Sequence, residues 1–288
     1  MTDNFVWYEL CTNDLEGAKA FYGKLFGWTA TRFEGEGAND YHILEMAGKG
    51  VGGLMPLPEG MPKPFWLGYV GVADADAAIE KAKAAGATIH RVMDIPSVGK
   101  IGLISDPQGV GYAVIQGYSD RKSEAFDQAK PGHGNWHELY TTDLAAAFDY
   151  YSAQYGWTKG RTMPMGEMGD YQLFQADGVD IGGMMKAPEN VPPSWGYYFG
   201  VEDIDEAEAR IKANGGTIAN GPMEVPGPAY IIQFTDPQGA YVCVVGPRKR
   251  GDEAWRPPHF TPRGRPGVRS PAGFRARPRS CSPPWWAW

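Results

Sequence analysis

The sequence contains few cysteines and no long apolar run, and both shortages narrow the class of protein. Three cysteines occur among 288 residues; Cys11, Cys243 and Cys281 lie far apart and form no C-x-x-C pair. Neither a disulfide framework nor a cysteine zinc site is indicated, so we expect reduced thiols. No run of about 18 apolar residues occurs, and the start lacks the basic and apolar stretches of a secretion signal. We therefore expect a soluble, cytoplasmic protein without a membrane partner.

Charge is distributed unevenly along the chain. Residues 248–288 hold nine Arg and one Lys against two acidic residues, a balance of +8. Subtracting this +8 from the total of −7 leaves −15 for residues 1–247. An acidic body of this kind repels nucleic acid and accepts neutral or cationic partners more readily. The tail, 248–288, is rich in Arg, Pro and Gly, and we expect it to be disordered.

An internal repeat is the strongest pattern in the sequence. WYELCTNDLEGAKAFYGKLFGW, residues 7–28, aligns without gaps on WHELYTTDLAAAFDYYSAQYGW, residues 136–157. Later landmarks, among them SDPQG and TDPQG, keep nearly the same offset. A period of about 130 residues is too long for a solenoid unit and is typical of a duplicated domain. The repeat predicts a first domain over 1–120, a linker over 121–134, a second domain over 135–247 and the tail over 248–288.

Each copy has the pattern of two β-α-β-β-β modules. Residues 5–12 alternate as a strand does, with Trp7 and Glu9 on one side. Asp14 is placed as a helix N-cap, and Gly27 as the left-handed residue that ends the helix. Short apolar runs bounded by glycines then follow, as strands of a meander do. Four such modules fill the two copies, which predicts an α+β fold.

The openings of the copies and the DPQG turns carry a family resemblance. A strand followed by Asp-Leu and a helix ending in FYGKLFGW, together with a DPQG turn before the last strand, resembles the vicinal oxygen chelate superfamily. This superfamily includes glyoxalase I, extradiol dioxygenases and bleomycin-resistance proteins. The resemblance covers all but the tail and implies tandem glyoxalase-like domains whose curved mixed sheets surround clefts. Whether modules pair within a copy, between copies or between chains stays open.

In the enzymes of that superfamily the cleft holds a divalent metal, bound by His or Gln on the first strand of each module and by Glu on the last. Counting from the capping Asp and from the DPQG turn carries these ligand positions onto eight residues of this chain. Seven of them offer no suitable lone pair, and the single thiol cannot make a site. We therefore predict no metal and no other cofactor, unless the counting is displaced. The eight are Trp7, Gly53, Leu67, Ala113, Trp136, Gly183, Gly196 and Cys243.

Glu9 and Glu138 each stand in the middle of an otherwise apolar strand, beside a tryptophan on the expected cleft face. An unpaired carboxylate would be costly to bury there. Three interpretations stay open: a structural hydrogen bond to backbone or a tyrosine, a partner for a ligand's polar or cationic group, or a general base with a raised pKa. These two residues are the catalytic candidates.

Aromatic residues on the same predicted face form a candidate ligand-binding wall. Large rings bind flat or cationic organic molecules through buried area and cation–π attraction, although they can equally fill a closed core. His137 lies one position off this face and is predicted to point toward the helices. The ligand-binding candidates are Trp7, Tyr69, Trp136, Tyr140 and Tyr198.

These patterns favour a metal-free, glyoxalase-like protein that binds a small neutral or cationic aromatic molecule, of the sequestration or resistance type. One alternative is a metal-dependent glyoxalase-type lyase or isomerase, or a dioxygenase. Another is a metal-free acid–base enzyme that uses Glu9 or Glu138. A small molecule is the expected partner, nucleic acid is not expected for the acidic body, and a homodimer is left open.

Overall fold

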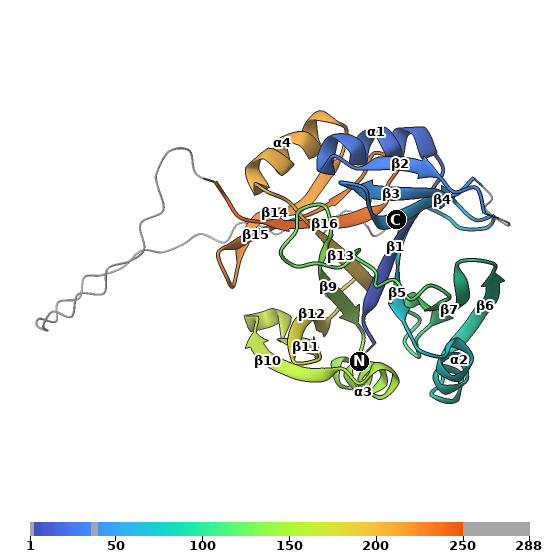
Figure 1. Ribbon diagram of the computed structural model, residues 1–288. Coiled ribbons are helices and arrows are strands. Elements are labelled where there is room, and N and C mark those ends of the chain that lie inside the picture. The colour runs from blue at the N-terminus through green and yellow to red at the C-terminus, as the bar shows by residue number, and fades with distance from the viewer. Residues whose placement is uncertain (1–2, 36–39, 250–288) are drawn as a thin grey trace, which may run out of the picture.

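The structure, a computed structural model, describes residues 3–35 and 40–249. These residues form two domains, each made of two β-α-β-β-β modules (Figure 1). The first domain contains two of these modules. Their elements are β1 (Phe5–Thr12), α1 (Leu15–Phe26), β2 (Thr29–Arg32), β3 (His42–Met46), β4 (Lys49–Pro56), β5 (Phe65–Gly71), α2 (Ala75–Ala84), β6 (Thr88–Ile95), β7 (Gly99–Ser105) and β8 (Gly111–Gly117).

The second domain repeats this order, with one added 3-10 turn. Its elements are β9 (Gly134–Thr141), α3 (Leu144–Tyr155), β10 (Thr158–Pro164), η1 (Gly166–Met168), β11 (Asp170–Ala176), β12 (Val179–Lys186), β13 (Ser194–Gly200), α4 (Ile204–Ala213), β14 (Thr217–Val225), β15 (Ala229–Thr235) and β16 (Tyr241–Gly246). The four β-α-β-β-β modules and the α+β class predicted from the sequence are confirmed.

Each domain forms one eight-stranded mixed sheet. The strand order is β2-β3-β4-β1-β5-β8-β7-β6 in the first domain and β10-β11-β12-β9-β13-β16-β15-β14 in the second. β1 pairs parallel with β4 and antiparallel with β5, which joins the two modules at the centre of the sheet. β9 makes the same two pairings with β12 and β13. The modules therefore pair within a copy, which resolves the alternative that the sequence left open.

The first helix of each domain begins and ends at the residues that the sequence predicts. Asp14 accepts a hydrogen bond from the Gly17 backbone N–H at 2.9 Å, and Gly27 ends α1 with a φ of 79°. Asp143 and Gly156 cap α3 in the same way. An acidic N-cap satisfies an N–H group that has no partner inside the helix, and glycine adopts the left-handed conformation without strain.

Each sheet has one face toward the helices and one away from them. Alternation along β1 places Tyr8 in the core on the helix side and Trp7 and Glu9 on the other side. Glu9 lies opposite Gly53 on β4 and opposite Leu67 on β5, so all three share that second face. We call the face away from the helices the open face of each domain.

The helix sides of the two sheets pack against each other. Tyr8 contacts Phe199 of the second domain with ring centroids 5.3 Å apart, and Phe5 contacts Trp195 at 5.2 Å. In Figure 1, α1 lies beside α4 and α2 beside α3, on either side of these central strands. One buried apolar cluster spans both domains. Because the helix sides are joined, the two open faces point away from each other.

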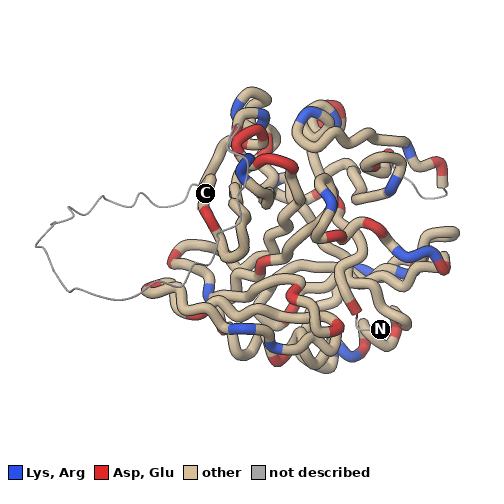
Figure 2. The backbone as a smooth tube through the Cα atoms, turned by 60° about the vertical axis from the view of Figure 1, so that its left-hand side comes forward, with Lys and Arg blue, Asp and Glu red and all other residues tan. Residues whose placement is uncertain are grey.

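Charged residues of both signs are interspersed along the chain in the view of Figure 2. Within residues 3–35 and 40–249, no helix combines the length and apolarity needed to cross a membrane. Arg248, at the start of the predicted tail, pairs with Asp205 at 2.7 Å and lies over the Tyr230 ring. The rest of that predicted disordered tail, from residue 250, lies outside the described residues.

Candidate functional site

Glu9 is the centre of the first open face. Its side chain is 7% exposed, and the Tyr69 hydroxyl donates a hydrogen bond to its Oε1 at 2.8 Å. Tyr41, which precedes β3, is its second hydroxyl partner and accepts a hydrogen bond from the Trp7 Nε1–H at 2.8 Å. Burial raises the pKa of Glu9, and the two tyrosine hydrogen bonds lower it in part. The carboxyl group is therefore held by phenols and not by a positive charge.

Glu138 is the equivalent centre of the second open face and is also 7% exposed. The Tyr198 hydroxyl donates to its Oε2 at 2.8 Å, and the Gln233 Nε2–H donates to the same oxygen at 3.2 Å. Tyr140 and Tyr171 also hydrogen-bond this carboxyl group. Burial raises the pKa of Glu138 against these four hydrogen bonds. Because the first and second open faces lie on different sheets, the two glutamates form separate sites.

Two glycines make room for the tyrosines that hold the glutamates. A Cβ added at Gly53 would overlap the Tyr41 hydroxyl, and one added at Gly183 would overlap the Tyr171 ring. On the second face Tyr171 accepts a hydrogen bond from the Trp136 Nε1–H at 2.9 Å. The structure thus places a tyrosine of this chain over two of the positions that the resemblance assigned to metal ligands.

Half-buried apolar side chains pack against the small buried clusters of each open face. They leave part of each open face apolar and in contact with solvent, which is the composition of many small-molecule binding surfaces. On the first face they are Trp7, Leu67, Met93, Ile95, Leu103 and Ile115. On the second face they are Trp136, Tyr140, Met163, Val225, Tyr241 and Val245.

The sequence-predicted aromatic residues all lie on the open faces, but they differ in exposure. Trp7, Trp136 and Tyr140 are half-buried and present ring surface. Tyr69 and Tyr198 are only 3% and 2% exposed, and their hydroxyls point to the glutamates. These two tyrosines thus position the carboxyl groups and offer little ring surface of their own.

Sequence reasoning missed three partners of the glutamates. Tyr41 and Tyr171 are the second residues of the equivalent stretches DYHILEM and DYQLFQA, so the recurrence of a tyrosine in both copies was a usable signal. Gln233 has no such signal, because Leu103 occupies its position in the first copy. Gln233 lies opposite Cys243 where β15 pairs with β16, and this places it on the second open face.

His137 lies on the helix side, as predicted from strand alternation, and belongs to the contact between the domains. Its side chain is completely buried; Nδ1 lies 2.7 Å from the Ile181 carbonyl oxygen and Nε2 lies 2.8 Å from the Tyr8 hydroxyl. Burial lowers the pKa of His137 to about 3. The ring is neutral at ordinary pH and acts as a structural hydrogen-bonding group.

The residues on the open faces do not fit the divalent metal of the superfamily's enzymes. Each centre offers one carboxyl group among tyrosines whose pKa is raised by burial. Burial also raises the pKa of Cys243, which disfavours its thiolate in the metal-free protein, and it is a single thiol. Across residues 3–35 and 40–249, no three His, Cys, Asp or Glu side chains converge to form a metal-binding group. The donor set is thus too small for a hard or borderline cation.

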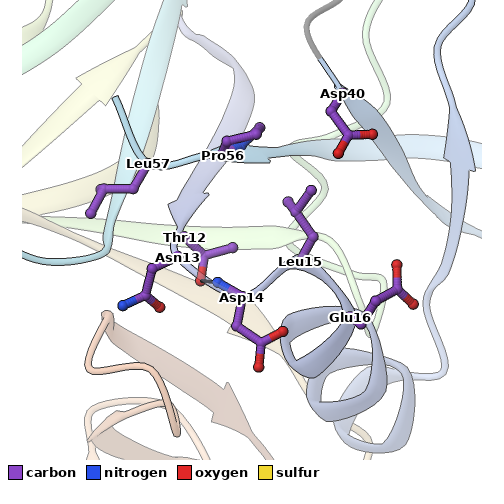
Figure 3. A pocket seen from close by; sticks show the side chains of 8 residues that line it. All are labelled: Thr12, Asn13, Asp14, Leu15, Glu16, Asp40, Pro56 and Leu57. Atoms are coloured by element: carbon purple, nitrogen blue, oxygen red, sulfur yellow. Dashed lines mark hydrogen bonds between the residues drawn. The ribbon is translucent and has the colours of Figure 1, made fainter. Parts of the chain in front are cut away.

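An open hollow of about 590 Å³ lies at the ends of β1 and β4 (Figure 3). Two of its acidic residues already have structural partners: Asp14 caps α1, and Glu16 pairs with Lys19 at 2.7 Å. None of the predicted site residues lines it. The hollow is lined by Thr12, Asn13, Asp14, Leu15, Glu16, Asp40, Pro56 and Leu57.

Two named relatives align over most of the chain. The sequence is 31% identical over 247 residues to "Putative glyoxylase CFP32" of Mycobacterium tuberculosis (strain CDC 1551 / Oshkosh). This alignment covers 84% of this chain and 94% of the relative. It is 30% identical over 261 residues to "Anthracycline biosynthesis protein DnrV" of Streptomyces peucetius, and this alignment covers 83% of this chain and 91% of the relative.

Solved structures show the same fold at low sequence identity. The Mn(II)-bound glyoxalase from Novosphingobium aromaticivorans superposes with a TM-score of 0.60 and 15% identity, over 86% of this chain and 83% of that one. The 2,3-dioxygenase LapB from Pseudomonas sp. KL28 gives a TM-score of 0.62 and 14% identity, over 89% and 97%. Residues 4–114 and 133–244 both match the family model. The chain therefore belongs to the Glyoxalase/Bleomycin resistance protein/Dioxygenase superfamily.

Proposed function

We propose that this chain is a metal-free member of its superfamily that binds a small neutral or cationic aromatic molecule, in the manner of a sequestration or resistance protein. The observation that supports this is a half-buried tryptophan beside a buried glutamate that has no positively charged partner. None of the ion pairs among the described residues includes Glu9 or Glu138.

The physical chemistry of the open faces suits such a ligand. A flat ring that covers Trp7 or Trp136 buries apolar area on both partners, and a cationic ring is also attracted by the indole face. The charge of −15 on residues 1–247 favours a cation over an anion at long range. The name of the Streptomyces relative, an anthracycline biosynthesis protein, adds polycyclic aromatic compounds to the probes worth testing.

A thermal-shift screen tests the proposal. The protein is dialysed against a chelator and screened with flat aromatic compounds, both neutral and cationic, including an anthracycline. A ligand that binds only the native state at 100 times its Kd raises stability by about 2.7 kcal/mol. We expect saturable stabilisation without added metal, and its loss in Trp7→Ala or Trp136→Ala. Absence of any stabilisation, or stabilisation that requires added metal, would contradict the proposal.

A metal-free acid–base enzyme is the second candidate, and the raised pKa of both buried glutamates favours it. A general base works best when its pKa is near the operating pH. Once a ligand is known, its chemical conversion is followed with the wild type, Glu9→Gln and Glu138→Gln. Unchanged ligand after prolonged incubation supports binding alone; turnover that one of these variants abolishes supports the enzyme.

A further inference from the structure

The two open faces are built from equivalent positions, but their central glutamates accept different numbers of hydrogen bonds from the protein. Glu138 accepts hydrogen bonds from the side chains of Tyr198, Gln233, Tyr140 and Tyr171. An ionised carboxylate offers about four lone-pair sites. The protein's own donors therefore fill the hydrogen-bonding capacity of Glu138.

Glu9 has two of these four donors. Tyr69 and Tyr41 are the equivalents of Tyr198 and Tyr171 and donate to it in the same way. The two remaining positions have changed between the copies. Cys11 stands where the second copy has Tyr140, and Leu103 stands where it has Gln233. A thiol is a weak donor and leucine is none, so about half of the capacity of Glu9 is unused.

The surroundings of Glu9 make this unused capacity costly. Leu67 lies opposite Glu9 on β5, and Trp7 and Leu103 pack on the same open face. The aliphatic and ring carbon atoms of these side chains cannot donate a hydrogen bond to a carboxylate. Burial disfavours a carboxylate that is only partly hydrogen-bonded. A ligand that brings a positive charge and N–H donors would offset this cost, and low polarity would strengthen the attraction.

We propose that the two open faces have diverged, and that the first is the cation-binding site, where Glu9 receives the N–H groups of a cationic aromatic ligand. Glu138 is a structural centre, because its lone pairs are already occupied. This inference rests on the proposed function and specifies the site and the charge of its ligand. It gives a stoichiometry of one cationic ligand per chain.

A matched pair of fluorescent probes tests this assignment. At pH 7.5, 9-aminoacridine is a cation with N–H donors, whereas acridine has the same ring system and is neutral. Calorimetric titration of the wild type is expected to give one site for 9-aminoacridine, with roughly tenfold tighter binding than acridine, which corresponds to one charge-assisted contact. Glu9→Gln is expected to abolish this preference, and Glu138→Gln to change it less than about twofold.

A second test keeps both glutamates and exchanges the residues at the equivalent positions 103 and 233. Leu103→Gln places on the first face the donor that the second face has, and it is expected to reduce the preference for 9-aminoacridine several-fold. Gln233→Leu frees part of Glu138 and is expected to add a second, weaker cationic site. Thermal unfolding of each variant confirms that it folds. If Glu9→Gln does not fold, Leu103→Gln decides the question.

The outcomes separate this inference from the proposed function. Equal affinity for the two probes in the wild type, with both lost in Trp7→Ala, overturns the inference and leaves aromatic binding in place. Loss of the charge preference in Glu138→Gln but not in Glu9→Gln also overturns it, because the cationic site would then be on the second face. If neither probe binds, both the inference and the proposed function fail for this class of ligand.

Discussion

A buried carboxyl group links the stability of this protein to pH, and Glu138 is the clearest case. Burial raises its pKa above the ordinary value, so the folded state holds the proton more tightly than the unfolded state does. Between the unfolded pKa and the raised folded pKa, the folded state binds more protons. Stability therefore falls as pH rises through that window, and the contribution of the protonated group is complete only below the unfolded pKa.

Replacement of Glu138 by glutamine removes this titration while it keeps the side-chain shape. The difference in free energy of unfolding, Glu138→Gln minus wild type, is expected to increase as pH rises from about 4. It is expected to level off above the folded pKa of Glu138. Each unit of pKa shift contributes about 1.4 kcal/mol to this change. Urea denaturation at a series of pH values measures it, with the exposed Glu189→Gln as the control for loss of one charge. A flat or falling difference would contradict the prediction.

Single residues were predictable from the sequence where they broke a local pattern. Glu9 and Glu138 interrupt apolar strands, and strand alternation correctly separated them from His137. Gln233 could not be predicted, because it reaches Glu138 from a strand 95 residues later in the chain. Such a contact depends on sheet register and leaves no local signature.

The DPQG turns join elements of opposite domains. Asp106 accepts backbone hydrogen bonds within its own turn and a hydrogen bond from the Tyr151 hydroxyl of α3 at 2.9 Å. Asp236 does the same with the Tyr22 hydroxyl of α1, also at 2.9 Å. The sequence identified the turns as family landmarks. Their contact with the other domain depends on how the two sheets pack, which a strand pattern does not contain.

The glutamines of these two turns differ in their hydrogen bonds, so their replacement by alanine is expected to change stability by different amounts. The Gln108 amide accepts from the Asp143 backbone N–H at 2.8 Å and donates to the Asp143 carbonyl oxygen at 2.9 Å, whereas Gln238 Oε1 is buried without a hydrogen-bond partner in the described chain. Gln108→Ala is expected to cost about 1 kcal/mol, because it removes these hydrogen bonds and the one that the buried Thr141 hydroxyl donates to Gln108 Oε1 at 2.6 Å. Gln238→Ala is expected to cost less than about 0.5 kcal/mol. Urea denaturation compares the two; equal costs would refute this difference.

At the scale of the whole molecule, periodicity and capping residues were sufficient to predict four modules but not their arrangement. The same strand pattern is compatible with pairing inside a copy or between copies. Pairing of β1 with β5 and of β9 with β13 places it inside each copy. The two domains are joined by contacts distant in sequence, among them Tyr8 with His137 and the Gly68 backbone N–H with the Tyr197 hydroxyl at 2.7 Å. These contacts merge the two domains into a single core, although each has its own sheet.

A shared core predicts that the domains unfold together. Tyr8 is completely buried and contacts His137, Tyr197 and Phe199 of the second domain. Tyr8→Ala is expected to cost about 3–5 kcal/mol, as other large aromatic truncations in cores do. At about 2–4 °C per kcal/mol for a chain of this size, Tm falls by roughly 6–20 °C.

Calorimetry of the wild type, of Tyr8→Ala and of the exposed control Val92→Ala is expected to show one transition each, with equal calorimetric and van't Hoff enthalpies. The control should stay within about 0.5 kcal/mol of the wild type. If Tyr8→Ala instead splits the transition and leaves one half at the wild-type Tm, the second domain is stable without the contact. The interface would then join two independent folding units, and the buried Tyr8–His137 pair would have to be explained by something other than stability.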